Sequence, residues 1–146
     1  MAEQTYKNHT RWHPVWHFIV YPLILATIVG AGINLYDTCH DHRDDNLYSA
    51  SLIFLISFLL LVMAFYSRLF ALKAQDRAIR AEENFRHFIL TGKPLPATLR
   101  VGQIVALRFA SDNEFPELVQ MANQKNMNAK AIKEAIKSWK ADYDRV

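Results

Sequence analysis

The residues best suited to chemistry are the six histidines and the single cysteine, because imidazole and thiolate groups bind metals. Three of the histidines are spaced four residues apart: His9, His13 and His17. Pro14 interrupts a continuous helix through all three. A second group with suitable ligand types comprises Cys39, His40, Asp41 and His42. Adjacent side chains face one ion only in a sharply folded loop, so we predict no metal site and keep this second group as an open alternative.

Other catalytic chemistry lacks a residue pattern in this sequence. Nucleophilic triads, glycine-rich phosphate loops and H-E-x-x-H motifs are absent. Haem between two membrane helices would need axial ligands inside the membrane, and only His17 lies even at the edge of an apolar run. We therefore predict no catalytic residue, no cofactor and no enzyme activity.

The elements that would position these residues are two long uncharged runs. Phe18–Tyr36 and Asn46–Ser67 are 19 and 22 residues long and carry no charged side chain. A helix needs about 20 residues to cross a bilayer. We predict an all-α membrane protein with a transmembrane helical hairpin: a first span over 14–36, an acidic loop over 37–46 and a second span over 47–72. A cleaved signal peptide is the competing interpretation of the first run, but its apolar core would be only about 7–15 residues.

Basic residues predict the orientation of this hairpin. Lys7 and Arg11 precede the first span, and Arg68 and Lys73 flank the end of the second, whereas the loop contains only Arg43. Lys and Arg stay on the cytoplasmic side. We therefore expect a cytoplasmic segment over 1–13, an outward loop and both termini in the cytoplasm.

The second span should continue as a helix beyond the membrane. No glycine or proline occurs from Leu47 to Leu90, and the first stop signal is Gly92, followed by Pro94. We predict a cytoplasmic extension over 73–91.

One face of this helix forms a small-residue seam with alternating spacings of three and four. Its members are Ala64, Ser67, Ala71, Ala74, Ala78, Ala81, Phe85 and Phe88. Small residues let helices approach closely. We expect the seam to contact a partner helix or a second copy, with Arg77, Arg80 and Arg86 as polar contacts beside it. Packing on the C-terminal segment of the same chain, or alanine used only for helix propensity, are the alternatives.

The remaining residues, 92–146, predict a small basic module of three short amphipathic helices. The first covers Thr98–Phe109, the second follows the capping-box pattern Ser111-x-x-Glu114, and the third starts at Asn128 and reaches Tyr143. From Arg68 to Val146 there are 14 Lys and Arg against 9 Asp and Glu, a balance of +5. A lysine stripe of the last helix could contact anionic lipid headgroups or form an ordinary solvated face: Lys130, Lys133, Lys137 and Lys140.

Several strings in the chain are also familiar: Tyr6–His9, Phe70–Glu83, Leu107–Asp112, Glu114–Leu118, Ile136–Trp139 and Asp142–Tyr143. With these strings the chain resembles, over nearly its whole length, a family of small bacterial two-span membrane proteins known only as a domain of unknown function. The resemblance implies a bacterial inner-membrane location and no activity, substrate or cofactor.

Two functional hypotheses follow. The first is a non-enzymatic inner-membrane interaction or scaffold protein, either an accessory subunit of another protein or a homo-oligomer, which docks through its cytoplasmic helices. The second is a membrane-tethered binder of anionic lipid headgroups or nucleic acid through the basic C-terminal half. Nucleic acid is the less favoured ligand, because Ala129–Tyr143 contains no Arg, Asn or Gln to read bases.

Overall fold

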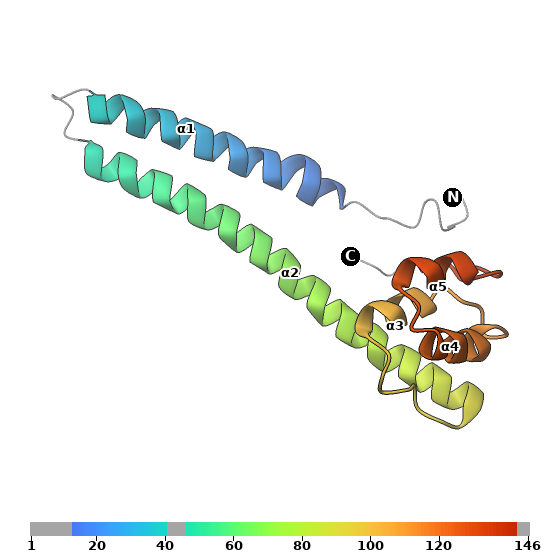
Figure 1. The fold of residues 1–146 in the computed structure, drawn as a ribbon. Helices are drawn as coiled ribbons and strands as arrows, with labels where there is room; N and C mark the ends of the chain where they lie inside the picture. The colour runs from blue at the N-terminus through green and yellow to red at the C-terminus, as the bar shows by residue number, and fades with distance from the viewer. Residues whose placement is uncertain (1–12, 41–45, 143–146) are drawn as a thin grey trace. The chain divides into compact units, whose positions relative to one another are not determined.

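The computed structural model describes residues 13–40 and 46–142, and within these ranges it contains five α-helices (Figure 1). The helices are α1 (Tyr21–His40), α2 (Leu47–Thr91), α3 (Val101–Leu107), α4 (Phe115–Gln124) and α5 (Ala129–Ala135), with a short π-helix, η1 (Trp16–Val20), directly before α1. This confirms the all-α class. The described residues divide into two compact units, the first comprising 13–40 and 46–71 and the second 72–142, and the boundary between them falls within helix α2.

The first unit is the predicted helical hairpin of α1 and the first part of α2. Small side chains are buried along α2 at intervals of seven: Ala50, Ser57 and Ala64. Ala31 and Thr38 are the buried residues of α1, also seven apart. A Cβ placed on Gly32 would lie 3.5 Å from the ring of Phe54, an ordinary van der Waals distance, so the Phe54 side chain of α2 reaches α1 at this glycine. Small residues in a heptad repeat permit such contact.

The first helix of the hairpin differs in detail from the predicted 14–36. It continues to His40, and a π-turn precedes it, in which the Tyr21 N–H donates to the Trp16 carbonyl oxygen. Pro22 supplies the physical reason, because it has no N–H to donate and its ring crowds the carbonyl one turn earlier. The turn before it widens, which is a common way to accommodate such a residue.

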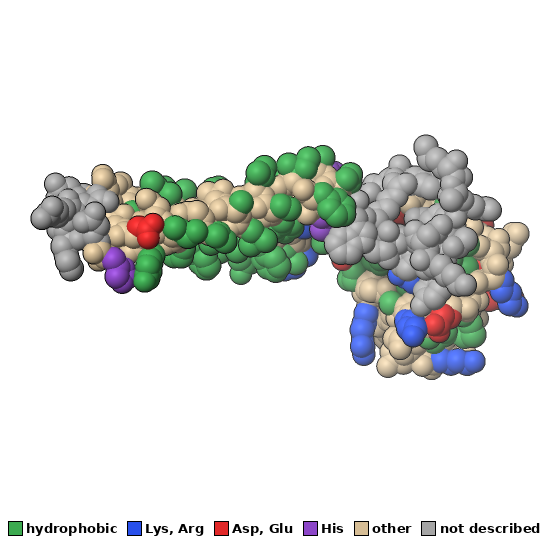
Figure 2. All heavy atoms as spheres, turned by 90° about the horizontal axis from the view of Figure 1, so that it is seen from above, with side chains coloured by type: hydrophobic (Ala, Val, Ile, Leu, Met, Phe, Trp, Pro, Cys, Tyr) green, Lys and Arg blue, Asp and Glu red, His purple; other side chains and the backbone are tan. Residues whose placement is uncertain are grey.

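Both helices of the hairpin are long and apolar enough to span a membrane. Hydrophobic side chains cover much of the hairpin surface (Figure 2). Only 6% of the apolar stretch of η1–α1 and 17% of that of α2 is buried. The core helix of a soluble protein would be mostly buried, so that explanation of the two apolar runs does not fit.

The second unit begins at Leu72 and includes the C-terminal part of α2. That helix ends at Thr91, and Gly92 follows with a left-handed φ of 71° and donates its N–H to the Phe88 carbonyl oxygen (2.8 Å). The predicted glycine stop is therefore confirmed. The core of this unit is formed by α3, α4, α5 and their connections, and its buried residues are Leu99, Ile104, Ala106, Leu107, Ala110, Phe115, Leu118, Val119, Ala122 and Ile132.

The helix starts in this unit follow local signals. Asn128 caps α5 as predicted, since its side chain accepts a hydrogen bond from the Ala131 N–H (2.8 Å). Helix α4 starts at Phe115, with Glu114 as the flanking residue and Pro116 in the first turn. This start lies four residues after Ser111 and suits Pro116, whose missing N–H is not needed in the first turn of a helix.

The prediction of one last helix from Asn128 to Tyr143 was wrong. Helix α5 ends at Ala135, and Trp139 instead forms an antiparallel bridge with Ala110. The Lys140 N–H donates to the Phe109 carbonyl oxygen (2.7 Å). Backbone hydrogen bonds to the segment after α3 thus take the place of the bonds that would have continued α5. Tyr143 lies outside the described residues.

Candidate interaction site

The surface of α2 beyond Leu72 has three faces that serve different contacts. The first face is buried in the second unit and includes Ile79, Glu83 and His87, which are 7–8% exposed. The His87 ring donates from Nδ1 to the Lys93 carbonyl oxygen (2.7 Å), which holds the chain as it leaves the helix. The other two faces carry the seam and a basic pocket.

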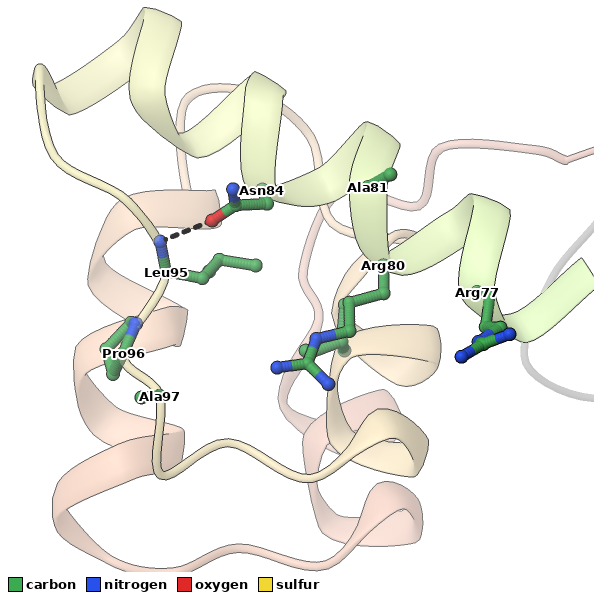
Figure 3. Close-up of a pocket in the computed structure, with 8 residues that line it drawn as sticks. Arg77, Arg80, Ala81, Asn84, Leu95, Pro96 and Ala97 are labelled. Carbon is green, nitrogen blue, oxygen red and sulfur yellow. Dashed lines mark hydrogen bonds between the residues drawn. The ribbon is translucent and has the colours of Figure 1, made fainter.

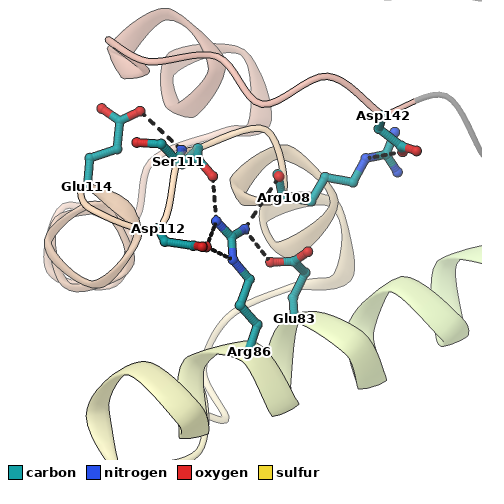
Figure 4. A network of polar contacts seen from close by, with 8 residues as sticks. Glu83, Arg86, Arg108, Ser111, Asp112, Glu114 and Asp142 are labelled. Carbon is teal, nitrogen blue, oxygen red and sulfur yellow. Dashed lines mark hydrogen bonds and ion pairs between the residues drawn. The ribbon is translucent and has the colours of Figure 1, made fainter.

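Arg86 joins α2 to the turn between α3 and α4 (Figure 4). Its Nε donates to Asp112 Oδ1 (2.7 Å), its Nη1 to Glu83 Oε2 (3.0 Å) and its Nη2 to the Ala110 carbonyl oxygen (2.7 Å). The guanidinium also lies 4.3 Å from the centre of the Phe115 ring. The planar fork of arginine suits such multiple acceptors. Arg86 is therefore engaged inside its own unit, although its sequence position lies beside the seam.

Glu83 shows how enclosed this network is. Burial raises the pKa of Glu83 above 4.5, while the hydrogen bond and charge of Arg86 act in the opposite direction. The net direction is upward, so desolvation of the carboxylate is the larger effect.

The structure divides the small-residue seam. Ala64 is buried in the hairpin, whereas Ser67 and Ala71 are exposed. The members beyond the first unit, which we call the distal seam, are all exposed: Ala74, Ala78, Ala81, Phe85 and Phe88. Phe85 is 65% and Phe88 53% exposed. The alternative in which the distal seam packs on the C-terminal helices of the same chain is therefore wrong, because those helices cover the opposite side of α2.

A hollow of about 430 Å³ lies beside the distal seam. Its walls combine apolar residues with charged ones: Glu82, Glu83, Phe85, Arg86, Ile89, Leu90, Asp112 and Lys140. Ile89 is 66% exposed at its edge and extends the apolar surface of Phe85. Neighbouring exposed apolar side chains of this kind are a feature of interaction surfaces.

The third face of α2 carries the basic pocket, a hollow of about 440 Å³ (Figure 3). Arg77, Arg80 and Asn84 line its helix side. The chain that returns from Gly92 to α3 lines the other side with apolar residues, among them Leu95 and Pro96. The Leu95 N–H donates to Asn84 Oδ1 (2.8 Å) and so attaches this returning segment to α2.

The predicted lysine stripe does not lie on one helix. Lys130 pairs weakly with Glu134 (3.9 Å), and the Lys133 ammonium lies 5.6 Å from the centre of the Phe109 ring. Lys137 and Lys140 follow the end of α5 and are exposed. Contact of these lysines with an anionic surface stays a prediction, without the helical face that motivated it.

Sequence reasoning missed the residues that hold the C-terminal segment. The Glu114 carboxylate accepts from the N–H groups of Lys137 and Ser138 (both 3.0 Å). Arg108, 6% exposed, pairs through Nε with Asp142 Oδ2 (3.0 Å). These contacts join residues 23 or more positions apart, so neither helical spacing nor a local motif signals them.

The predicted metal-binding alternative gains no support from the described part of the chain. Cys39 is an exposed free thiol, and the His40 ring hydrogen-bonds to the Tyr36 carbonyl oxygen (2.8 Å). His42 lies outside the described residues. Among residues 13–40 and 46–142, no three His, Cys, Asp or Glu side chains gather around a point where an ion could sit.

The whole chain, residues 1–146, matches a family of unknown function, DUF6526. No curated protein and no solved structure matches the chain.

Proposed function

The chain belongs to the DUF6526 family of unknown function, and from this premise we propose that it is a non-enzymatic membrane-anchored interaction protein that assembles through the distal seam of α2. The observation that carries the proposal is the exposure of that apolar face on a helix whose opposite face is already covered. In this proposal the hairpin is the anchor and the second unit is the cytoplasmic part.

A second copy of the chain is the proposed occupant of the distal seam. The five residues of this face carry no charge, so two identical faces can meet without repulsion. Their spacing of three and four is that of helices that pack side by side. The hairpin already buries small residues of α2 in such a repeat, at Ala50 and Ser57.

The assembly test compares two alanine variants with a matched control. Ala74→Leu and Ala78→Leu add bulk at the close contact and should destabilise it by about 1–3 kcal/mol. Gln120→Leu adds an apolar side chain at an exposed position of α4, outside the seam and outside both hollows. Native mass spectrometry of the full chain in mild detergent should show a homo-oligomer for the wild type and Gln120→Leu, and smaller species for the seam variants. A monomeric wild type, or a foreign subunit in place of the second copy, would contradict the proposed assembly.

The membrane anchor has its own test, because Cys39 is the only cysteine and is exposed beside the loop. The proposed location is the bacterial inner membrane with both termini in the cytoplasm, supported by the basic flanks of the hairpin. A membrane-impermeant maleimide should label Cys39 in intact spheroplasts. In a Cys39→Ser background, Lys93→Cys should be labelled only after lysis. Labelling of Lys93→Cys in intact spheroplasts would contradict the orientation.

The second candidate function is binding of anionic lipid headgroups or nucleic acid through the basic C-terminal half. The exposed Lys137 and Lys140 favour it. The full chain in neutral nanodiscs should then bind DNA or anionic vesicles, with an affinity that falls as salt rises. Equal binding to neutral vesicles would contradict this function.

A further inference from the structure

We propose that the basic pocket formed by Arg77, Arg80 and Asn84 binds the phosphate of an anionic phospholipid headgroup. The inference rests on the proposed membrane location. The pocket shares one lining residue, Ala81, with the distal seam, but the proposed ligand contacts come from other residues and do not involve the lysines after α5.

The helix places three donors on one face. Arg77, Arg80 and Asn84 are three and four residues apart, so their side chains leave α2 on the same side. Both arginines line the pocket and are exposed, and neither forms an ion pair or hydrogen bond with the described part of the chain. Figure 3 shows the Arg80 guanidinium extending toward the returning segment.

A hydrogen bond from Leu95 orients the side-chain amide of Asn84, so that its nitrogen is left to donate. Its Oδ1 accepts from the Leu95 N–H (2.8 Å), which orients the amide group. The amide nitrogen then keeps two hydrogens for a ligand. Within residues 13–40 and 46–142, no hydrogen bond from this nitrogen occurs.

The charge of the pocket selects an anion. Its described lining contains two arginines and no Asp or Glu. Guanidinium groups bind phosphate through paired N–H donors, and these charge-assisted bonds are stronger than neutral ones. By contrast, Arg86 on the neighbouring face is neutralised by Glu83 and Asp112.

The apolar side of the pocket selects a lipid over other phosphates. Leu95, Pro96, Ala97 and Ile104 face the arginines, and they offer contact to the glycerol and upper acyl carbons of a phospholipid. No aromatic ring is part of the described lining, so bases of a nucleic acid would have nothing to stack on. Arg77 follows Ala71 by six residues, about 9 Å of helix rise, which suits a headgroup at a bilayer surface.

The test uses the full chain in neutral detergent with soluble short-chain lipids. Dioctanoyl phosphatidylglycerol should bind saturably. Dioctanoyl phosphatidylcholine should bind more weakly, because its choline cation meets the two arginines. Equal binding of the two lipids would overturn the proposal. Inorganic phosphate that binds as tightly as phosphatidylglycerol would overturn the choice of a lipid.

The variants separate the pocket from general surface charge. Arg77→Gln with Arg80→Gln should weaken phosphatidylglycerol binding at least about tenfold, since charge-assisted bonds are lost. Asn84→Asp keeps an acceptor for the Leu95 N–H but adds a negative charge, so it should fold and also lose binding. The matched control, Lys93→Gln with Lys125→Gln, removes two exposed charges outside every proposed binding surface and should bind as the wild type does. A control that loses as much as the arginine variant would overturn the proposal.

Because the lipids are soluble, binding is measured whether or not the chain inserts in a membrane. Failure of the membrane location would appear in the labelling of Cys39 and Lys93→Cys, and failure of the pocket would appear in this titration.

Discussion

Replacing Arg86 with alanine should loosen the contact between α2 and the turn before α4. The Arg86 side chain is 12% exposed and donates to Glu83, Asp112 and the Ala110 carbonyl oxygen. Its removal leaves the buried Glu83 carboxylate without the Arg86 cation. It also leaves the carbonyl oxygen of the fully buried Ala110 without the hydrogen bond that Arg86 donates.

The expected cost follows from these contacts. Breaking a buried ion pair by removing one partner costs about 3–5 kcal/mol, and a buried acceptor that loses its donor costs about 1–3 kcal/mol. The Asp112 side chain is 61% exposed, so losing its ion pair with Arg86 adds little to the cost. The contacts share one guanidinium and their costs do not add. We therefore expect a loss of about 3–4 kcal/mol.

Amide hydrogen exchange of the full chain in detergent measures this loss locally. Exchange in α3 and α4 should accelerate roughly a hundredfold or more, as expected for about 3 kcal/mol. Arg86→Lys, which keeps the charge but not the fork, should fall between the wild type and Arg86→Ala. Arg80→Ala is the matched control on the same helix and should change the opening free energy by no more than about 0.5 kcal/mol. Equal exchange in Arg86→Ala and Arg80→Ala would refute the reasoning and assign the docking of α2 to apolar contacts alone.

Three further substitutions test other parts of the second unit. Glu83 has a raised pKa in the folded state, so its contribution to stability is greatest below the unfolded-state pKa and declines as pH rises through the folded value. The stability of Glu83→Gln relative to the wild type should therefore increase from about pH 4 to pH 7 in thermal unfolding; a pH-independent difference would contradict this sign. Gly92→Ala places a side chain at φ 71° with open space around it, so it should cost about 1 kcal/mol from backbone strain alone, and unchanged thermal stability would speak against the left-handed stop. Glu114→Ala should expose the Lys137 and Ser138 amides to rapid exchange, with Glu117→Ala, on the exposed surface of α4, as control.

Local signals in the sequence predict much of this fold. Gly92 ends α2 through its left-handed backbone, and Asn128 begins α5 through a side-chain hydrogen bond. Both helix ends can therefore be predicted from the local sequence, without knowledge of the tertiary contacts. The two uncharged runs likewise predict the hairpin, because length and apolar composition are local properties of the sequence. The end of α5 could not be read this way, because the helical spacing of Ile132, Ile136 and Trp139 continues past Ala135.

The candidate sites were predicted only in part. The spacing of the seam identifies a helix face, but Ile79, Glu83 and His87 also share a face, and the sequence does not say which one the C-terminal helices cover. The basic pocket requires the segment around Leu95 to return to α2, which a hydrogen bond to Asn84 fixes across 11 positions.

The shortness of α3, α4 and α5 sets the order in which the second unit can fold. Helices of 7, 10 and 7 residues are unstable in isolation, whereas the 45-residue α2 can form first. The contacts that hold the small helices close long loops, 26 residues from Arg86 to Asp112 and 30 from Phe109 to Trp139. Closing these loops costs chain entropy, so such contacts are unfavourable until α2 has formed and the small helices can pack against it. We therefore expect α2 to act as the template on which the last helices condense together, late and in a single step.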